Sequence, residues 1–126
     1  MLYILYLILN LLIRNIPFFA KGLALDDLIL VEEIDNKLVY KKTVNYSGNS
    51  TYRVFTNSDL EGFDFLWKIL EGFGCTYERG TKNLYAINVP PSCDIFKVYE
   101  ILELGEKRKI WEFDEGFCGH PSIFTE

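Results

Sequence analysis

Apolar and polar positions follow two different periods along the chain, and each change of period marks a change of predicted element. Residues 26–46 (DDLILVEEIDNKLVYKKTVNY) hold two stretches rich in Leu, Ile, Val and Tyr around Asp35-Asn36-Lys37, which supplies turn chemistry. The second stretch alternates from one face to the other, as a strand does. The pattern predicts a β-hairpin, followed by a further strand over residues 51–56 (TYRVFT).

The helical period begins in residues 57–74 (NSDLEGFDFLWKILEGFG). Ser58 and Glu61 have the spacing of a capping box, and Gly72 or Gly74 is suited to end the helix. Apolar residues recur every three or four positions and predict one buried stripe. The stripe consists of Leu60, Phe63, Leu66, Trp67, Leu70 and Phe73.

A second helix is predicted over residues 92–109 (SCDIFKVYEILELGEKRK). Ser92 or Asp94 is the expected N-cap, and Gly105 is the expected terminator. The Lys107-Arg108-Lys109 run that follows suits the C-terminal end of a helix, where cations are favoured. The side chains expected to face inward are Ile95, Val98, Ile101 and Leu102.

Residues 75–91 predict a second hairpin between the two helices, with its turn at GTKN and a stop at Pro90-Pro91, and KIWEF (109–113) predicts a last short strand. From residue 51 the order is strand, helix, strand, strand, helix, strand. This order is typical of a ferredoxin-like βαββαβ unit, with two helices on one face of a mainly antiparallel sheet and its first and third strands in the middle.

The expected fold class is therefore α+β, with an N-terminal β-hairpin segment joined to the ferredoxin-like unit. A chain of 126 residues is long enough to bury a core as one domain. Its expected parts are an apolar segment over 1–14, a β-hairpin part over 15–50, the ferredoxin-like part over 51–117 and a tail over 118–126.

The first thirteen residues, MLYILYLILNLLI, form an apolar run interrupted only by Asn10. A membrane helix needs about 20 apolar residues, and a signal peptide carries positive charges before its apolar region, so the run fits neither well. We expect a buried strand or the distorted start of a truncated chain. Export or membrane anchoring through residues 1–20, with cleavage near Gly22-Leu23-Ala24, is the alternative.

Charge and cysteine content narrow the function classes. A net charge of −5 argues against a nucleic-acid binder, whose affinity rests on basic side chains, and favours a basic protein partner. The odd cysteine count (Cys75, Cys93, Cys118) argues against a disulfide framework and predicts a reducing, cytoplasmic compartment.

Three segments carry a family resemblance: NIPFFAKGLALDDLILVEE (15–33), YSGNSTYRVF (46–55) and WEFDEGFCGHP (111–121). With them, the chain resembles the bacterial domain-of-unknown-function family 4265 over residues 11–121. The most specific positions are Asn15-Ile16-Pro17-Phe18-Phe19, Asp27, Ser47-Gly48-Asn49-Ser50-Thr51, Arg53 and Gly119-His120-Pro121.

The resemblance implies that further β-rich sequence usually precedes the NIPFF segment. We therefore expect that the first strands of the family are missing here and that MLYILYLILN stands in their place. The family has no established activity, so the resemblance implies no catalytic residue.

The stretch from Ser47 through Gly48, Asn49 and Ser50 to Thr51 lacks a phosphate-loop pattern and leads into a strand. Gly48-Asn49 suits a tight turn with positive backbone angles. The alternative is a binding loop in which Arg53 contacts an anion.

His120 is the single histidine, and no Gly-x-Ser-x-Gly elbow is present to make it part of a serine triad. Its spacing from Cys118, Cys93 and Asp114 matches no zinc pattern, and no third group is evident for a cysteine–histidine pair. We expect no catalytic residue, no metal and no cofactor, and interpret His120-Pro121 as the end of the last strand.

Two other groups of residues can each be interpreted in structural or in functional terms. The acidic cluster of Asp26, Asp27, Glu32, Glu33 and Asp35 is expected to be a solvated strand edge, with a patch for a basic partner as the alternative. Pro17, Phe18 and Phe19 are expected to pack in the core, with an interface anchor as the alternative.

The leading functional hypothesis is a non-catalytic binding module that masks a protein partner, of the immunity type. The alternative is a ferredoxin-like regulatory module that binds a small molecule, with Arg53 on an anionic ligand. A third hypothesis is an enzyme that uses the carboxylates or Cys118.

Overall fold

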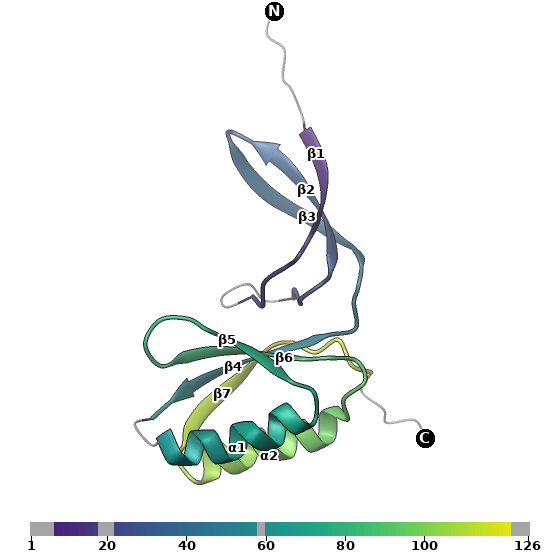
Figure 1. Cartoon of the computed structure of the whole chain (residues 1–126). Coiled ribbons are helices and arrows are strands. Elements are labelled where there is room, and N and C mark those ends of the chain that lie inside the picture. The colour runs from purple at the N-terminus through teal and green to yellow at the C-terminus, as the bar shows by residue number, and fades with distance from the viewer. Residues whose placement is uncertain (1–6, 18–21, 58–59, 122–126) are drawn as a thin grey trace, which may run out of the picture.

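The structure is a computed structural model, and it describes residues 7–17, 22–57 and 60–121. Within these residues the chain is an α+β protein with two helices and seven antiparallel strands in two sheets (Figure 1). The elements in chain order are β1 (Leu7–Leu12), β2 (Leu28–Ile34), β3 (Lys37–Asn45), β4 (Ser50–Thr56), α1 (Leu60–Gly72), β5 (Thr76–Arg79), β6 (Leu84–Val89), α2 (Ile95–Lys107) and β7 (Trp111–Phe117).

The N-terminal sheet has the order β1-β2-β3 and contains the first predicted hairpin. Asp35 and Asn36 both have positive φ angles, 52° and 64°, which a two-residue type I′ hairpin turn requires. β1 pairs with β2 from Leu7↔Glu33 to Leu12↔Leu28. Residues 7–12 of the apolar run thus form a strand, but the prediction that this strand is buried is wrong, because Ile8 and Leu12 are 60% and 44% exposed.

The second sheet has the order β5-β6-β4-β7, with every neighbouring pair antiparallel. α1 and α2 lie side by side on one face of this sheet (Figure 1). β4 and β6 occupy its two central positions. β7 runs from Trp111 to Phe117 and is longer than the predicted strand, because its pairing with β4 continues to Thr51↔Phe117.

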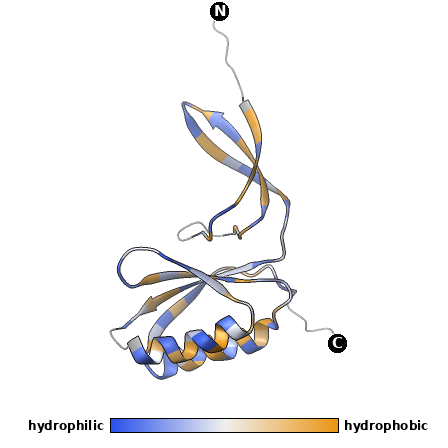
Figure 2. Cartoon of the chain, in the orientation of Figure 1, coloured by the Kyte–Doolittle hydropathy of each residue, from blue (hydrophilic) through white to orange (hydrophobic). Residues whose placement is uncertain are grey.

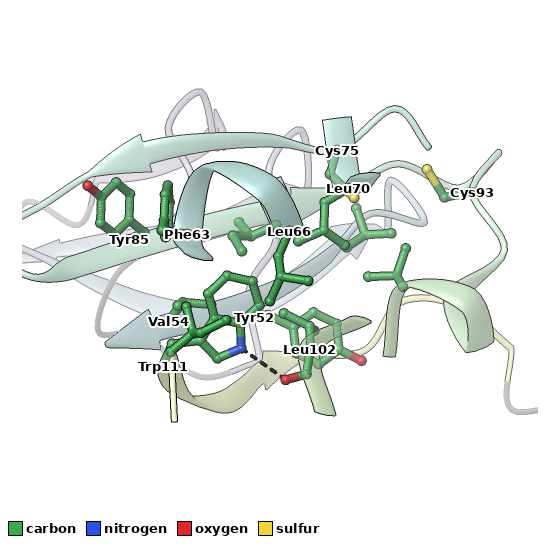
Figure 3. Packing of buried hydrophobic residues seen from close by; sticks show 14 residues of the cluster. Tyr52, Val54, Phe63, Leu66, Leu70, Cys75, Tyr85, Cys93, Leu102 and Trp111 are labelled. Atoms are coloured by element: carbon green, nitrogen blue, oxygen red, sulfur yellow. Dashed lines mark hydrogen bonds between the residues drawn. The ribbon is translucent and has the colours of Figure 1, made fainter. Parts of the chain in front are cut away.

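The hydrophobic core lies between this sheet and the two helices (Figure 3). Phe63, Leu66 and Leu70 of α1 are buried there and Trp67 and Phe73 are half-buried, which confirms these members of the predicted stripe; Ser58 of the predicted capping box lies outside the described residues. The indole of Trp111 is 1% exposed, and its Nε1 donates to the Leu102 carbonyl at 2.9 Å. The core therefore satisfies the polar atom of its largest side chain internally.

Two helix ends match the predictions and one does not. Gly74 follows α1 with a φ of 105°, and the Asp94 carboxylate caps α2 by accepting from Phe96 N at 3.0 Å. The prediction that Gly105 ends α2 is wrong, because the helix continues to Lys107. Gly105 is buried under the indole of Trp111, which a Cβ atom at this position would overlap. The glycine allows close packing within the helix and does not end it.

The two sheets differ in what covers them. Figure 2 shows apolar residues along all three strands of the N-terminal sheet, and no helix of the described residues packs on this sheet. The register places Ile8, Glu32 and Val39 side by side on one face. We call this surface the open face, and it carries Ile8, Leu12, Ile34 and Val39, which are exposed, and Leu28 and Leu30, which are half-buried.

None of the helices in the described ranges is long and apolar enough to cross a membrane.

Candidate functional site

A cluster of buried polar side chains lies where the segments before β2 and β4 meet the second sheet. We call it the polar junction, and it consists of Asp27, Ser47, Asn49, Ser50, Thr51, Asn88 and His120. Six of these residues are buried, and Ser47 is half-buried. Most of the candidate site residues named from the sequence therefore meet in one place, although they come from positions up to 93 residues apart.

Asp27 is fully buried and organises the N-terminal half of the junction. Its Oδ2 accepts from Ala24 N at 3.0 Å, and its Oδ1 accepts from Ser47 N at 2.9 Å. Ser47 Oγ lies 3.0 Å from the same Oδ1 and 2.7 Å from the Leu25 carbonyl. Backbone amides that donate to a carboxylate offset the cost of its burial, so Asp27 joins the two ends of the β2–β3 hairpin.

Asn49 connects this half to the second sheet. Its Nδ2 donates to the Leu25 carbonyl at 2.8 Å, and its Oδ1 accepts from Asn88 Nδ2 at 3.2 Å. Gly48 beside it has a φ of 89°, in the left-handed region that the turn interpretation requires. The polar side chains of Ser47 and Asn49 thus form hydrogen bonds within the protein, to the segment before β2 and to Asn88 of β6.

Ser50 and His120 form a close pair in the other half of the junction. Ser50 Oγ lies 2.6 Å from His120 Nδ1, and His120 Nε2 lies 2.9 Å from the Pro90 carbonyl. A carbonyl can only accept, so Nε2 donates to it, and Nδ1 shares the second hydrogen bond of the ring with the Ser50 hydroxyl. Gly119 N also donates to Ser50 Oγ at 2.9 Å. The pair fastens the chain after β7 onto β4 and β6.

This arrangement is not that of an activated serine. Ser50 is 0% exposed, and the group that orients His120 is a backbone carbonyl, not a carboxylate. Gly119 is packed so closely that a Cβ atom there would overlap the Asn49 carbonyl. Sequence reasoning named both residues but did not pair them, because 70 positions separate them and no motif spacing indicates the contact.

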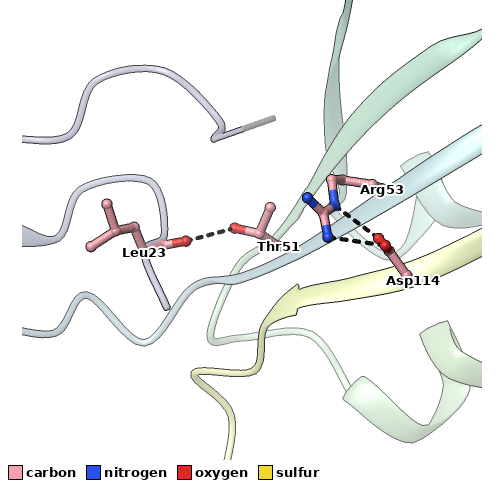
Figure 4. A network of polar contacts seen from close by, with 4 residues as sticks. All are labelled: Leu23, Thr51, Arg53 and Asp114. Carbon is pink, nitrogen blue, oxygen red and sulfur yellow. Dashed lines mark hydrogen bonds and ion pairs between the residues drawn. The ribbon is translucent and has the colours of Figure 1, made fainter. Parts of the chain in front are cut away.

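Arg53 already has an anionic partner inside the protein. Its Nε and Nη2 donate to Oδ1 and Oδ2 of Asp114 at 2.8 and 2.9 Å, across the β4–β7 pair (Figure 4). Beside it, Thr51 Oγ1 donates to the Leu23 carbonyl at 3.4 Å. Arg53 is 8% exposed, so an anionic ligand would have to displace Asp114 from a bidentate contact. This geometry weighs against the anion-binding interpretation of Arg53.

The acidic cluster of the first hairpin is not a continuous surface patch. Asp27 is buried, which corrects the expectation that it lies on a solvated edge. Glu32 pairs with Lys41 at 3.2 Å, while Asp26 and Asp35 are exposed in left-handed conformations. Asp27 is therefore buried in hydrogen bonds, Glu32 forms an ion pair, and Asp26 and Asp35 lie exposed in turns.

The remaining candidates are Pro17 and the phenylalanines after it. Pro17 is half-buried, and the neighbouring Ile16 is buried with its N–H donating to Glu78 Oε2 at 2.7 Å. Phe18 and Phe19 lie outside the described residues. In the part of the chain that the structure describes, no group of three or more His, Cys, Asp or Glu side chains is placed to hold a metal ion.

The fold and the site define an α+β protein whose two sheets are joined through a buried polar network. A family model described as "Domain of unknown function (DUF4265)" matches residues 10–113, and the chain belongs to this family. The matched range includes Asp27 and the Ser47–Thr51 stretch but ends before Gly119-His120-Pro121.

One solved structure is similar over most of the chain. It is described as a hypothetical protein from Neisseria gonorrhoeae, with 26% sequence identity and a TM-score of 0.79, covering 89% of this chain and 78% of that chain. No curated protein matches the chain. The similarity extends across both sheets and carries no activity with it.

Proposed function

We propose that this chain is a small, non-catalytic bacterial binding module that covers and masks a protein partner, in the manner of an immunity protein. The open face of the N-terminal sheet is the observation that carries this proposal. Ile8, Leu12 and Ile34 are 60%, 44% and 41% exposed on it. Contiguous apolar surface of this kind marks interaction sites in soluble proteins.

The open face is continuous across all three strands. Ile8 of β1 and Val39 of β3 both lie beside Glu32, and Leu12 lies beside Leu28. Glu32 pairs with Lys41 at 3.2 Å, and the register also places Asn10, Lys37 and Lys42 on this face, beside Leu30 and Ile34. A partner therefore meets apolar side chains interspersed with polar ones, and it has to pair or desolvate Lys37 and Lys42 to cover the face.

The polar side chains of the junction hold the fold together, which supports a binding role over a catalytic one. Ser50 and His120 are both buried, and their hydrogen bonds hold backbone segments together. A nucleophile has to reach a substrate, and Ser50 has no exposed surface from which to do so.

We further infer that residues 51–117 form a ferredoxin-like unit and that both sheets belong to one domain. The strand order β5-β6-β4-β7 with two helices on one face supports the first inference, and the shared polar junction supports the second. The net charge of −5 favours a basic partner. The three free thiols support a reducing, cytoplasmic setting.

The test compares two lysine substitutions at exposed apolar positions. Val39→Lys places a charge on the open face, and Phe65→Lys places one on α1, where Phe65 is 60% exposed. Affinity capture from the native cell extract should retain one near-stoichiometric protein on the wild-type chain and on Phe65→Lys, but not on Val39→Lys. The captured protein, purified alone, should then rebind with the same pattern and lose its own activity when bound.

If both variants retained the partner equally, the open face would not be part of the interface. A homodimer that dissociates in Val39→Lys, measured by light scattering, would assign the face to a second copy of the chain and contradict the masking role.

A further inference from the structure

A second surface, on the helix side of the four-stranded sheet, has the features of a small ligand site. A hollow of about 240 Å³ lies between β4, β7 and the first turns of α2. The side chains that line it include Tyr52, Ile95, Phe96, Tyr99, Glu115 and Cys118. Pockets for drug-sized ligands range from roughly 300 to 1,000 Å³, so this hollow fits one small chemical group.

Aromatic rings form the walls of the hollow. The rings of Tyr52 and Tyr99 are 6.4 Å apart at an interplanar angle of 64°, and Phe96 stands on the same end of α2. Tyr52 is a core residue with 1% exposure, and its ring also packs against Phe113 with 6.4 Å between the centroids. The exposed rings of the hollow are those of Phe96 and Tyr99, at 48% and 43%. An exposed aromatic ring face attracts an ammonium or guanidinium group through cation–π interaction.

Among the described residues, one charged side chain lines this hollow, and it is the carboxylate of Glu115. Glu115 Oε1 accepts from the Tyr52 hydroxyl at 3.2 Å. Burial, and then the negative charge of Glu115, raise the pKa of the Tyr52 phenol, so the hydroxyl stays protonated and donates to the carboxylate. No cation among the described residues pairs with Glu115, in contrast to Glu32 and Asp114.

The charge distribution along the chain supports the same ligand class. Residues 58–126 hold thirteen of the eighteen acidic side chains but seven of the thirteen basic ones. This half of the chain therefore attracts cations over a distance, and Glu115 is placed to receive one. The other carboxylate nearby, Asp94, is committed to capping α2 through Phe96 N.

We propose that the hollow formed by Tyr52, Phe96, Tyr99 and Glu115 binds an organic cation, either an alkylammonium or a guanidinium group. The rings of Phe96 and Tyr99 supply the apolar, electron-rich surface, Glu115 supplies the opposite charge, and the Tyr52 hydroxyl holds the Glu115 carboxylate in place. This site is separate from the open face and goes beyond the proposed masking function. Two sources share the chemistry: a free amine, and a lysine or arginine side chain of a protein.

Isothermal titration at fixed ionic strength tests the proposal on the full chain. Choline should bind, and its uncharged carbon isostere 3,3-dimethylbutan-1-ol should bind about tenfold more weakly or not at all, because it has the shape without the charge. Glu115→Gln keeps an acceptor for Tyr52 but loses the charge, and should weaken choline binding about tenfold. Tyr99→Leu should weaken choline binding to a similar extent, because it removes one aromatic ring of the hollow.

Glu112→Gln is the matched control, because Glu112 lies on the same strand and points to the opposite face of the sheet. Glu112→Gln should bind choline as the wild type does. Val39→Lys should also bind choline normally, so a loss of partner capture in that variant would not reflect damage to this site. N-acetyl-lysine amide and N-acetyl-arginine amide, titrated in parallel, distinguish the sources by which cation binds most tightly. The proposal is overturned if none of the three cations binds more tightly to the wild type than to Glu115→Gln, or if the uncharged isostere binds equally well.

Discussion

The two sheets of this protein bury their apolar side chains in different ways. The four-stranded sheet is closed on one face by α1 and α2, and fourteen buried residues form a continuous core between them. The N-terminal sheet buries Ile29 and Val31 on one face, while its other face exposes Ile8, Leu12 and Val39. The first part carries its own hydrophobic core, and the second depends on the hydrogen bonds of the polar junction.

The difference indicates how stability is distributed. Local opening is easiest where few apolar contacts are buried and many backbone groups lie near solvent. We therefore expect the helix-covered part to set the global unfolding free energy and the N-terminal sheet to open at lower cost. The proposed partner-binding surface and the less stable sheet then coincide, as is common for binding regions.

Removing the largest core side chain should have the greatest effect. Trp111→Ala should lower the unfolding free energy by about 3–5 kcal/mol, because it leaves a cavity and removes the donor to the Leu102 carbonyl. Chemical denaturation followed by circular dichroism measures the change. Phe65→Ala, at a 60% exposed position, is the control and should change stability by less than about 0.5 kcal/mol. Similar losses in both variants would contradict the assignment of the core.

Breaking the polar junction should loosen the N-terminal sheet selectively. Asp27→Asn replaces one carboxylate oxygen by a donor that cannot accept from Ser47 N or Ala24 N, at a cost of about 1–3 kcal/mol. Hydrogen exchange should accelerate at β2 amides and stay nearly unchanged at β6. Asp26→Asn is the matched control, because Asp26 is exposed with a φ of 66°, which asparagine also tolerates. Equal acceleration in both sheets would mean that they open as one unit.

The features of the two sheets that depend on local sequence were predictable from the chain alone. The three- and four-residue spacing of Phe63, Leu66 and Leu70 identifies the buried side of α1, and Asp35-Asn36 identifies the hairpin turn by its tolerance of positive φ. Both signals act within one turn or one loop. The α+β class followed from them.

The parts that depend on tertiary contacts were not predictable. Gly105 has the sequence pattern of a helix terminator, and only the position of Trp111 shows that it is a packing glycine. Asp27 stands in an acidic run typical of a surface, yet it is buried. The pairing of Ser50 with His120 spans 70 positions and has no local signature. Each contact arises from how distant segments fold together, which periodicity does not encode.

High pH should weaken the helix-covered part. Burial, and then the neighbouring Cys93, raise the pKa of the Cys75 thiol to about 12, above its ordinary value of 9.0. Between pH 9 and 12 the unfolded chain therefore loses this proton while the folded chain retains it, and stability falls as pH rises. The contribution is at most about 1.4 kcal/mol per pH unit for one group.

Cys75→Ala tests the origin of this fall. Urea unfolding from pH 7 to 11 should give a shallower decline above pH 9 in the variant, although its stability at pH 7 is lower because of the smaller side chain. Below pH 8 the two curves should run parallel, since the thiol is protonated in both states. Parallel curves up to pH 11 would show that Cys75 does not titrate with a raised pKa.

The smallest expected effect on stability comes from the surface that should matter most for binding. Val39→Lys changes a 40% exposed side chain on an edge strand, so its unfolding free energy should differ from that of the wild type by less than about 0.5 kcal/mol. Both the wild type and Val39→Lys should have the mass of a monomer, because the masking role assigns the open face to a different protein and not to a second copy of the chain. Thermal unfolding and static light scattering measure the two quantities on the same samples. A loss of more than about 1 kcal/mol would show that Val39 is covered by the chain itself, and the open face would then belong to the protein's own packing and not to a partner.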